Sequence, residues 1–482
     1  MRIKRTISAV LIVTLAIVAI AVAYLVPEPD RTATEPPMVT ANAGVLTLTC
    51  AGGVERTITG LNPDNAEETY SGTASVLMGS VPAGTEWTAF DGVTTNVTAS
   101  PVGEGLTGQT NLGTPELAGV LSILGAADAR VITGATTFVG SDGDLRGTAS
   151  NPCQWGNAVA WLVGGSTEVG SSTVLVIANP SLTTVEARIE AFGPAGPLDL
   201  GSNAVVNLPA RSVREITLEG VMDPHDRIAL RVGTTSGSLT AVLRTTALDG
   251  YTPRGVSFVN PSAVGSTLVI PGVTIPALTS GEKTVAGATE ATLRIVNPTD
   301  AIRTADVKVI TANGKVDLPG GNDIQIAPGA VLDLTLGGLG TGERAIVVEA
   351  DGDVSAGVLL RETEMEGKRA DIAWLSATPQ VTSGSATVGK GDSVVAIEGT
   401  ATVTWHAYDA TGAEIGSEAV EVTNVGAVKL PAGTVFVSVD SSAPIRGAVR
   451  TRTWVAGGWG IDWAPLTVGV AESTSVKVKV GN

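Results

Sequence analysis

The stretch VLVIANPS, at residues 174–181, is an apolar run that stops at Asn-Pro, and LRIVNPTD at residues 293–300 repeats it. Asn297 follows Asn179 by 118 residues. Proline lacks the N–H that a sheet needs and fixes φ, so it ends a central strand, and the preceding asparagine can close the turn through its own side chain. We interpret the doublet as a strand-ending turn of a repeated fold rather than as a ligand loop.

The repeat continues downstream of both Asn-Pro copies. Each copy contains an alternating strand, a Gly-containing turn and a second strand, at residues 226–261, 343–379 and 434–466, with a divergent earlier version at 134–155. By sequence, one arginine falls at a matching place in the three later copies (Arg244, Arg361, Arg450), and so does one aromatic residue (Phe258, Trp374, Trp463). The fourth copy lacks Asn-Pro in its stretch Ala396–Gly412.

Turn signals divide one repeat into short strands. Between Asn-Pro, Gly-Pro, Leu-Pro-Ala, Ser-Gly and Asp-Gly we expect seven strands, near residues 173–178, 185–192, 203–208, 212–218, 227–233, 238–246 and 254–259. Seven alternating strands in about 100 residues are typical of an immunoglobulin-like sandwich. The prediction is an all-β chain of tandem immunoglobulin-like sandwiches, with a β-propeller-like arrangement as the alternative.

Composition supports this class. The 482 residues hold 59 Gly and 25 Pro, with 4% aromatic and 16% charged residues, which favours short strands joined by turns. The formal net charge of −17 argues against nucleic-acid binding, which needs basic surfaces.

The N-terminus predicts export. Arg2, Lys4 and Arg5 precede an apolar run at residues 7–26 that is long enough to span a bilayer as one helix with the basic end in the cytoplasm. Ala21-Val22-Ala23 is also an A-x-A pattern, so a signal peptide cut before Tyr24 stays open as the alternative. We expect a single-pass plasma-membrane protein with its bulk outside, or a secreted one if the segment is cleaved.

The chain has two cysteines, Cys50 and Cys153. In an exported protein this count predicts one disulfide, with two buried free thiols as the alternative.

Residues suited to catalysis are scarce. His225 and His406 are the only histidines, and no nucleophile elbow is present. Many Asp and Glu residues are present, and Asp142, Asp144, Asp351 and Asp353 lie in turns that Asp-Gly chemistry explains without a catalytic role. We predict no catalytic residues, no metal ligands and no cofactor; a carboxylate-dependent enzyme acting on glycans is the alternative.

The best binding candidate is the stretch TWVAGGWGIDWAP, which carries Trp454, Trp459 and Trp463 across a glycine turn. Exposed indoles could form a platform for sugar rings, whereas inward-facing ones would pack the last sandwich. Trp463 has aromatic counterparts in the other copies, which favours a core position for it, and Trp459 has none.

The basic and apolar N-terminus, the cysteine near the start of the exported part, the later VNP repeats and the block NPCQW…AWLVGGSTEVGSSTVLVIANPS, Asn151–Ser181, resemble an actinobacterial family of membrane-associated proteins of unknown function. The resemblance covers most of the exported region and implies an envelope protein with a role near cell-surface polysaccharide. It carries over no catalytic residue.

These observations predict a non-enzymatic, extracytoplasmic scaffold or binding module whose partners are the membrane, cell-surface glycan or envelope proteins. An adhesin-like secreted protein is the alternative if the N-terminal segment is cleaved. The predicted division is 1–6 cytoplasmic, 7–26 transmembrane, 27–40 spacer, 41–155 first β unit with the disulfide, 156–265 second β unit, 266–380 third β unit, and 381–482 fourth β unit with a C-terminal strand.

Overall fold

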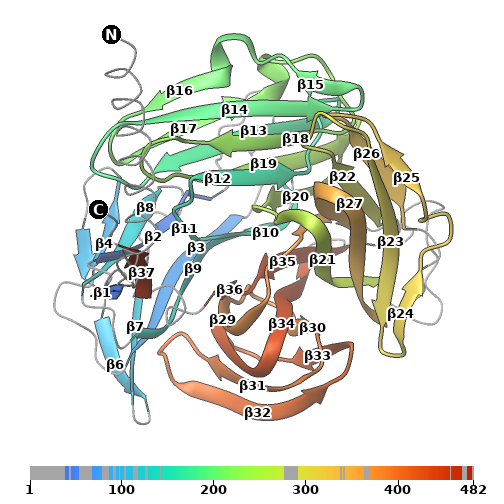
Figure 1. The fold of residues 1–482 in the computed structure, drawn as a ribbon. Coiled ribbons are helices and arrows are strands. Elements are labelled where there is room, and N and C mark those ends of the chain that lie inside the picture. Colours follow the sequence, from blue (N-terminus) through green and yellow to red (C-terminus); the bar gives the residue numbers. More distant parts are fainter. Residues whose placement is uncertain are drawn as a thin grey trace, which may run out of the picture. The chain divides into compact units, whose positions relative to one another are not determined.

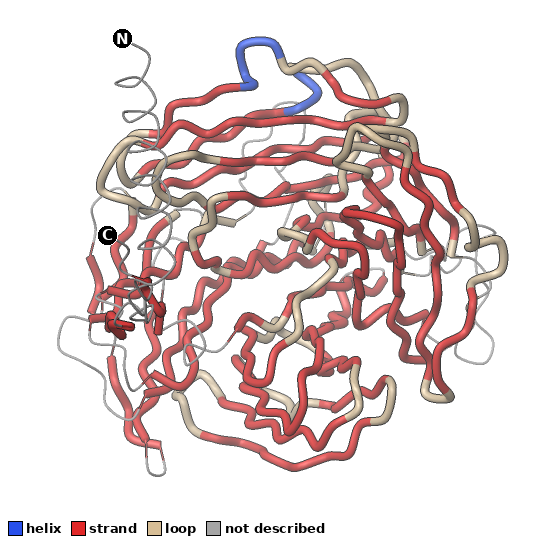
Figure 2. Tube along the Cα trace, viewed as in Figure 1, coloured by secondary structure: helices blue, strands red, loops and turns tan. Residues whose placement is uncertain are grey.

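Strands make up most of the described chain, as the red segments of Figure 2 show. The structure is a computed structural model that describes residues 38–42, 45–53, 68–78, 86–90, 94–96, 98–102, 105–111, 118–124, 129–141, 143–275, 291–336, 339, 342–362, 370–455, 458–468 and 475–479. The predicted transmembrane segment and most of the spacer lie outside these residues. Within them, no helix is long and apolar enough to cross a membrane.

The chain divides into two units, residues 1–42 with 475–482, and residues 43–474. In the smaller unit, β1 (Met38–Asn42) pairs antiparallel with β37 (Ser475–Lys479). The predicted C-terminal strand is therefore present.

Two five-stranded antiparallel sheets form the first β unit. One has the order β10-β9-β3-β7-β6, with bounds Gly147–Pro152, Ala129–Gly140, Glu68–Met78, Gly105–Asn111 and Thr98–Val102. The other has the order β11-β2-β8-β4-β5, with bounds Gln154–Trp155, Val45–Cys50, Gly119–Leu124, Glu86–Ala89 and Thr94–Asn96.

The second β unit also has two sheets, and all seven strands expected from its turn signals are present (Figure 1). The first has the order β12-β18-β14-β15, with β16 also on β14, and bounds Val159–Val163, Ala229–Gly233, Val185–Gly193, Gly196–Leu198 and Val205–Leu208. The second has the order β17-β13-β19-β20, with bounds Ser212–Thr217, Ser171–Asn179, Thr240–Asp249 and Thr252–Val259. Two short 3-10 helices, η2 (Gly201–Ala204) and η3 (Leu218–Gly220), complete it.

In the third β unit a single long strand, β27 (Gly342–Arg361), joins both sheet layers. Its first half pairs with β21 and β23, and its second half pairs with β22 and β28. The remaining bounds are β21 Val264–Ile275, β22 Thr292–Val296, β23 Arg303–Thr311, β24 Gly314–Asp317, β25 Ile324–Ile326, β26 Val331–Thr335 and β28 Ile372–Ser376.

The fourth β unit repeats this plan with β34 (Phe436–Val455) as its long strand. β29 and β31 pair with the first half of β34, and β30 and β35 with its second half. The remaining bounds are β29 Val381–Thr387, β30 Asp392–Glu398, β31 Ala401–Tyr408, β32 Glu414–Val422, β33 Val425–Lys429, β35 Gly458–Pro465 and β36 Thr467–Val468.

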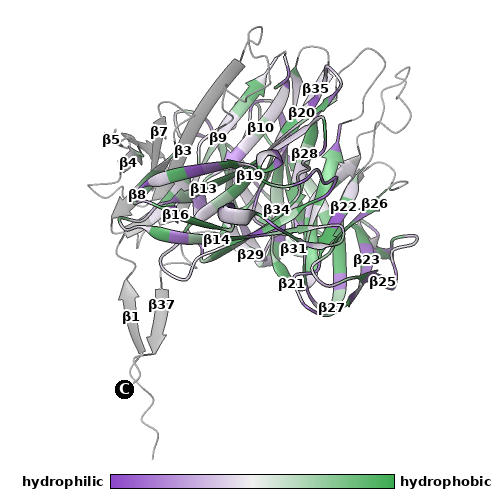
Figure 3. Ribbon diagram, turned by 90° about the horizontal axis from the view of Figure 1, so that it is seen from above, coloured by the Kyte–Doolittle hydropathy of each residue, from purple (hydrophilic) through white to green (hydrophobic). Residues whose placement is uncertain are grey.

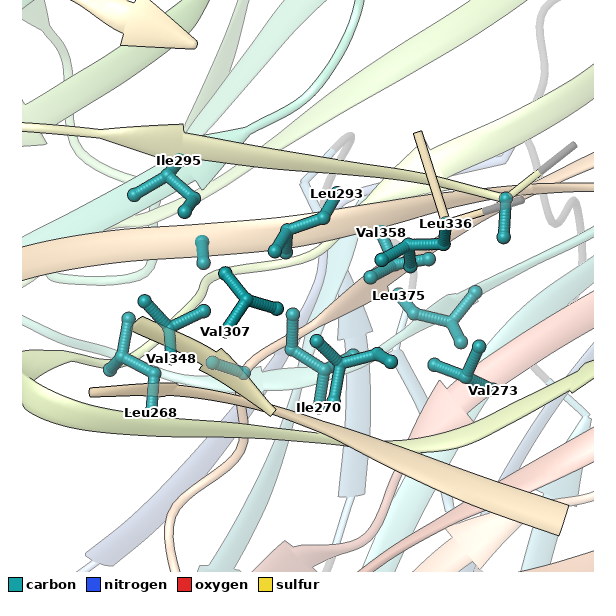
Figure 4. Close-up of a cluster of buried hydrophobic side chains, with 14 of the residues drawn as sticks. Leu268, Ile270, Val273, Leu293, Ile295, Val307, Leu336, Val348, Val358 and Leu375 are labelled. Carbon is teal, nitrogen blue, oxygen red and sulfur yellow. The ribbon is translucent and has the colours of Figure 1, made fainter. Parts of the chain in front are cut away.

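One four-strand order therefore recurs in every unit: β7-β3-β9-β10, β17-β13-β19-β20, β26-β22-β27-β28 and β33-β30-β34-β35. The strands of the second, third and fourth units bury their apolar faces, as the green stretches of Figure 3 indicate. Figure 4 shows this for the third unit, where Leu268, Leu293, Val307 and Val348 come from four strands.

The Asn-Pro turns repeat almost atom for atom. Nδ2 of the fully buried Asn179 donates to the carbonyl oxygens of Thr183, Leu208 and Pro209 at 2.8, 3.0 and 2.8 Å, and its Oδ1 accepts from Ser181. Asn297 makes the same set of bonds, with every partner displaced by 118 residues: Ala301, Ile326, Ala327 and Thr299. The interpretation of the doublet as a strand-ending turn is confirmed.

Candidate functional site

The last strands of the four repeated sheets meet within the larger unit. β10 packs against β20 and β35, and β28 packs against β20 and β35, so the four strands close a ring. None of these four strands pairs with another in a regular ladder.

The Asp371 carboxylate lies inside this ring and is fully buried. Oδ2 accepts from the backbone N–H of Thr148 and of Ile461, both at 3.0 Å. Oδ1 accepts from the N–H of Val256 at 3.2 Å, and the N–H of Ile372 also bonds to the carboxylate. One amide from each of the four strands thus converges on one side chain.

Glycine occupies the matching position on the other three strands. Gly255 and Gly460 stand three residues before Phe258 and Trp463, as Asp371 stands three residues before Trp374. A Cβ on Gly255 would lie 2.2 Å from Oδ1 of Asp371, one on Gly147 2.5 Å from the same atom, and one on Gly460 3.2 Å from Oδ2. At the position shared by Gly147, Gly255, Asp371 and Gly460, the ring therefore has room for one side chain.

Burial raises the pKa of Asp371 from 3.8 to about 8, because an ionised carboxylate loses its water there. The backbone N–H groups of Thr148, Ile461 and Ile372, together with the positive charge of Arg146, oppose that shift. Arg146 is itself buried and donates to the carbonyl oxygens of Ala370 and Val455 at 3.1 and 3.3 Å. Asp371 and its surroundings hold together strands from all four units.

Asp462 plays a similar bridging role between two strands. Its Oδ1 accepts from the N–H of Ser150 at 2.9 Å, and burial raises its pKa above the usual value. Asp371 and Asp462 are thus both engaged by backbone amides.

Aromatic residues interlock neighbouring units. Phe258 packs in a cluster with Phe138 and Ala149 of the first unit, and Trp374 packs in the core of the second. Trp463 packs in the core of the third unit, and its Nε1 donates to the carbonyl oxygen of Pro271 at 3.1 Å. The sequence-based expectation of a core position for Trp463 is confirmed.

A cavity of about 600 Å³ lies where the second and third units meet. Its lining is mostly polar and includes the charged residues Glu168, Asp226, Arg254, Arg294, Asp333, Arg361 and Asp371. It also contains Leu248, Leu359 and Trp374.

Arg294 fixes the inner wall of this cavity. Its guanidinium makes two bonds of 2.8 Å to Asp333, stacks over Trp374 with its Cζ 5.1 Å from the ring centroid, and donates to three backbone carbonyls of the second unit. Those carbonyls belong to Gly165, Asp226 and Ile228. A side chain with this many partners holds the two units together on one side of the cavity.

The three predicted platform tryptophans separate into two environments. Trp454 is 52% exposed and stands opposite Trp459 in the β34–β35 hairpin, with ring centroids 5.1 Å apart in an edge-to-face arrangement. Arg452 stacks on Trp459 at 4.5 Å and pairs with the buried Glu362 at 2.5 Å. Trp454 and Trp459 therefore remain a surface pair, whereas Trp463 is 3% exposed and lies in the core.

The strand register corrects one sequence alignment. Arg244 lies opposite Phe258 and Arg450 opposite Trp463, but Leu359 lies opposite Trp374 and Arg361 opposite Ile372. Arg361 is thus two residues out of the matching position. Arg244 pairs with Glu215 at 3.1 Å and Arg450 with Glu343 at 2.7 Å, whereas Arg361 lines the cavity.

The predicted disulfide is present between Cys50 and Cys153, which lie 103 residues apart. It joins β2 to the segment between β10 and β11 in the first unit. Nδ2 of Asn151 and Oγ1 of Thr136 donate to the carbonyl oxygen of Gly52, so the strand ends next to the disulfide are also tied by hydrogen bonds.

Other candidate groups stay apart. His406 lies 3.3 Å from Glu414, and neither histidine lines the cavity. In the part of the chain that the structure describes, no group of three or more His, Cys, Asp or Glu side chains could hold a metal ion. Sequence reasoning missed Asp371; the signal was an Asp three residues before Trp374 where two other copies have Gly.

The fold defines an all-β protein built from several antiparallel sheets. The chain belongs to the family of unknown function DUF5719, whose model matches residues 119–433. No curated protein matches the chain.

Among solved structures, the chain has 11% identity and a TM-score of 0.12 to an E. coli alpha-2-macroglobulin, covering 90% of this chain and 30% of that one. It has 8% identity and a TM-score of 0.09 to the pilus adhesin SpaC from Lactobacillus rhamnosus GG, covering 83% and 56%. The chain thus spans less than two thirds of both proteins.

Proposed function

We propose that this chain is a non-enzymatic, extracytoplasmic cell-envelope protein that binds or scaffolds cell-surface polysaccharide. The observation that carries the proposal is the rigid aromatic pair of Trp454 and Trp459. Trp459 is held between Trp454 and the guanidinium of Arg452, and Arg452 is fixed by a buried carboxylate. An exposed indole in a fixed orientation suits stacking on the apolar face of a sugar ring with little loss of side-chain entropy.

The proposal of a non-enzymatic role rests on the state of the buried carboxylates. Asp371 accepts hydrogen bonds from four backbone amides, and Asp462 accepts one from Ser150. A general acid or base needs oxygens that are free to exchange a proton with the substrate, and a carboxyl group whose oxygens are taken up by backbone amides is poorly suited to that task, even though Asp371 lines the cavity. Turnover of a polysaccharide by the purified protein would favour the alternative, a carboxylate-dependent enzyme.

Location outside the cytoplasm is supported by the disulfide, since such bonds persist in oxidising compartments. The apolar run at residues 7–26 would anchor the chain as a single-pass protein of the plasma membrane in an actinobacterial envelope. N-terminal sequencing of the mature protein tests this: a start at Tyr24 would mean a secreted, adhesin-like protein.

At the level of architecture, we propose that each unit is an immunoglobulin-like sandwich and that four such units are arranged around the inner strands β10, β20, β28 and β35. The two-sheet packing of the second unit supports the sandwich. The ring of inner strands supports the β-propeller-like arrangement that the sequence left open as the alternative.

A glycan array probed with the full chain tests the binding function, followed by a pull-down of polysaccharide from envelope extracts. The proposal predicts that the chain retains a defined set of glycans and that the variant Trp454→Ala no longer retains them. Glycans that Trp454→Ala still retains would have to be lost in variants of a second glycan-binding surface. Leu182→Ala is a suitable control because Leu182 is 78% exposed and lies in the Asn-Pro turn region of the second unit. Absence of glycan binding by the intact chain would contradict the proposal.

A further inference from the structure

We propose that the cavity between the second and third units binds a short, neutral oligosaccharide; this rests on the proposed glycan-binding function and names a site for it that is separate from Trp454. The volume of about 600 Å³ is in the range of small-molecule sites, which often lie between domains.

The lining chemistry selects the class of ligand. Acidic and basic side chains are mixed, with Glu168 and Asp226 facing the same space as Arg254 and Arg361, so a ligand of one strong charge meets repulsion as well as attraction. Six residues with hydroxyl groups line the cavity: Ser166, Ser171, Thr173, Thr245, Thr246 and Thr292. The hydroxyls of Ser166, Thr173 and Thr245 donate to backbone carbonyl oxygens, so they offer a ligand their remaining lone pairs as acceptors. Such polar groups suit the hydroxyl groups of a neutral sugar.

The walls are already organised for binding. Arg294 ties both units together through its bonds to Asp333 and to three backbone carbonyls. The loop after β12 is held against β19 by the bond from the N–H of Leu248 to the carbonyl oxygen of Gly170 at 2.6 Å. A preformed cavity loses little conformational entropy when its ligand binds.

One exposed aromatic residue lies in the turn that joins two strands of the cavity lining. Tyr251 is 100% exposed and lies in the turn between β19 and β20, the strands that supply Leu248 and Arg254 to the lining. Glu168, also exposed, lines the cavity and forms no salt bridge with another described residue. These two side chains can be replaced without disturbing a core.

The test is isothermal titration of the full chain with neutral gluco-, manno- and galacto-configured trisaccharides and with uronate-containing trisaccharides. We expect a neutral trisaccharide to bind, and Tyr251→Ala and Glu168→Gln each to weaken it about tenfold, which is the effect of losing one aromatic or charged contact. The control variant Leu182→Ala should leave this affinity unchanged, because Leu182 is exposed and does not line the cavity.

The controls separate two kinds of failure. If Trp454→Ala abolishes binding while Tyr251→Ala and Glu168→Gln do not change it, the cavity is not the site and the proposed function survives. Preference for the uronate-containing probes would also overturn the inference. If no trisaccharide binds and the glycan array is empty as well, both the inference and the proposed function fail.

Discussion

Replacing Asp371 by Asn tests the role of the buried carboxylate at the ring of inner strands. With a pKa of about 8, the side chain at neutral pH is mostly the neutral acid, whose hydroxyl oxygen can still accept a hydrogen bond. The change to Asn keeps the shape of the side chain, but it puts an NH2 group, which cannot accept, where an oxygen accepts from the N–H of Val256 or from those of Thr148 and Ile461. One or two buried amides then lose their acceptor. Each unsatisfied buried donor costs about 1–3 kcal/mol, so we expect Asp371→Asn to destabilise the folded chain by roughly 2–5 kcal/mol.

The assay is equilibrium unfolding in urea at neutral pH, followed by tryptophan fluorescence and by circular dichroism. Asp353→Asn is the matched control, because Asp353 is exposed and should change stability by less than about 0.5 kcal/mol. If Asp371→Asn unfolds at the same urea concentration as the native chain, the four amides do not depend on the carboxylate and the reasoning is wrong.

Three further predictions follow from the same contacts. First, the free energy of unfolding should fall by at most about 6 kcal/mol as pH rises from about 4 to about 8. The pKa of Asp371 is 3.8 in its ordinary state and about 8 in the fold, so the folded chain holds the proton more tightly in this window. Urea titrations at several pH values check the sign, and in Asp371→Asn the free energy of unfolding should change less with pH. Second, Asn179→Ala and Asn297→Ala should each cost about 2–4 kcal/mol and by similar amounts, since their bonds match; thermal denaturation of the two variants would refute this if only one were affected. Third, reduction of the Cys50–Cys153 disulfide should destabilise the chain by about 4–5 kcal/mol, as expected for a closed loop of 103 residues, and urea unfolding with and without reductant measures it.

Much of the second unit could be predicted from the sequence because its signals are local. Asn-Pro, Leu-Pro-Ala and Asp-Gly each end a strand by their own backbone chemistry, and the expected strands lie where those signals put them. The disulfide followed from the cysteine count, and the core position of Trp463 from its counterparts Phe258 and Trp374.

What the sequence could not give depends on contacts between units. The register of β27 places Leu359, rather than Arg361, opposite Trp374, and this pairing is set by the contact between two strands that are distant from any turn signal. Asp371 resembles an ordinary residue at the start of a strand, and its role depends on amides of β10, β20 and β35, which come from the other three units. The cavity likewise combines residues of two units.

The central claim is that backbone amides from the inner strands of the other three units converge on the carboxyl group of Asp371, in addition to the amide of Ile372. Asp371→Gly would give all four strands the same small residue at that level and leave the amides without an acceptor. Thermal denaturation of this variant with and without millimolar formate or acetate tests the claim most directly. We predict that either small carboxylate raises the melting temperature of Asp371→Gly and leaves that of the native chain unchanged; an equal response of the two proteins, or none in the variant, would contradict it.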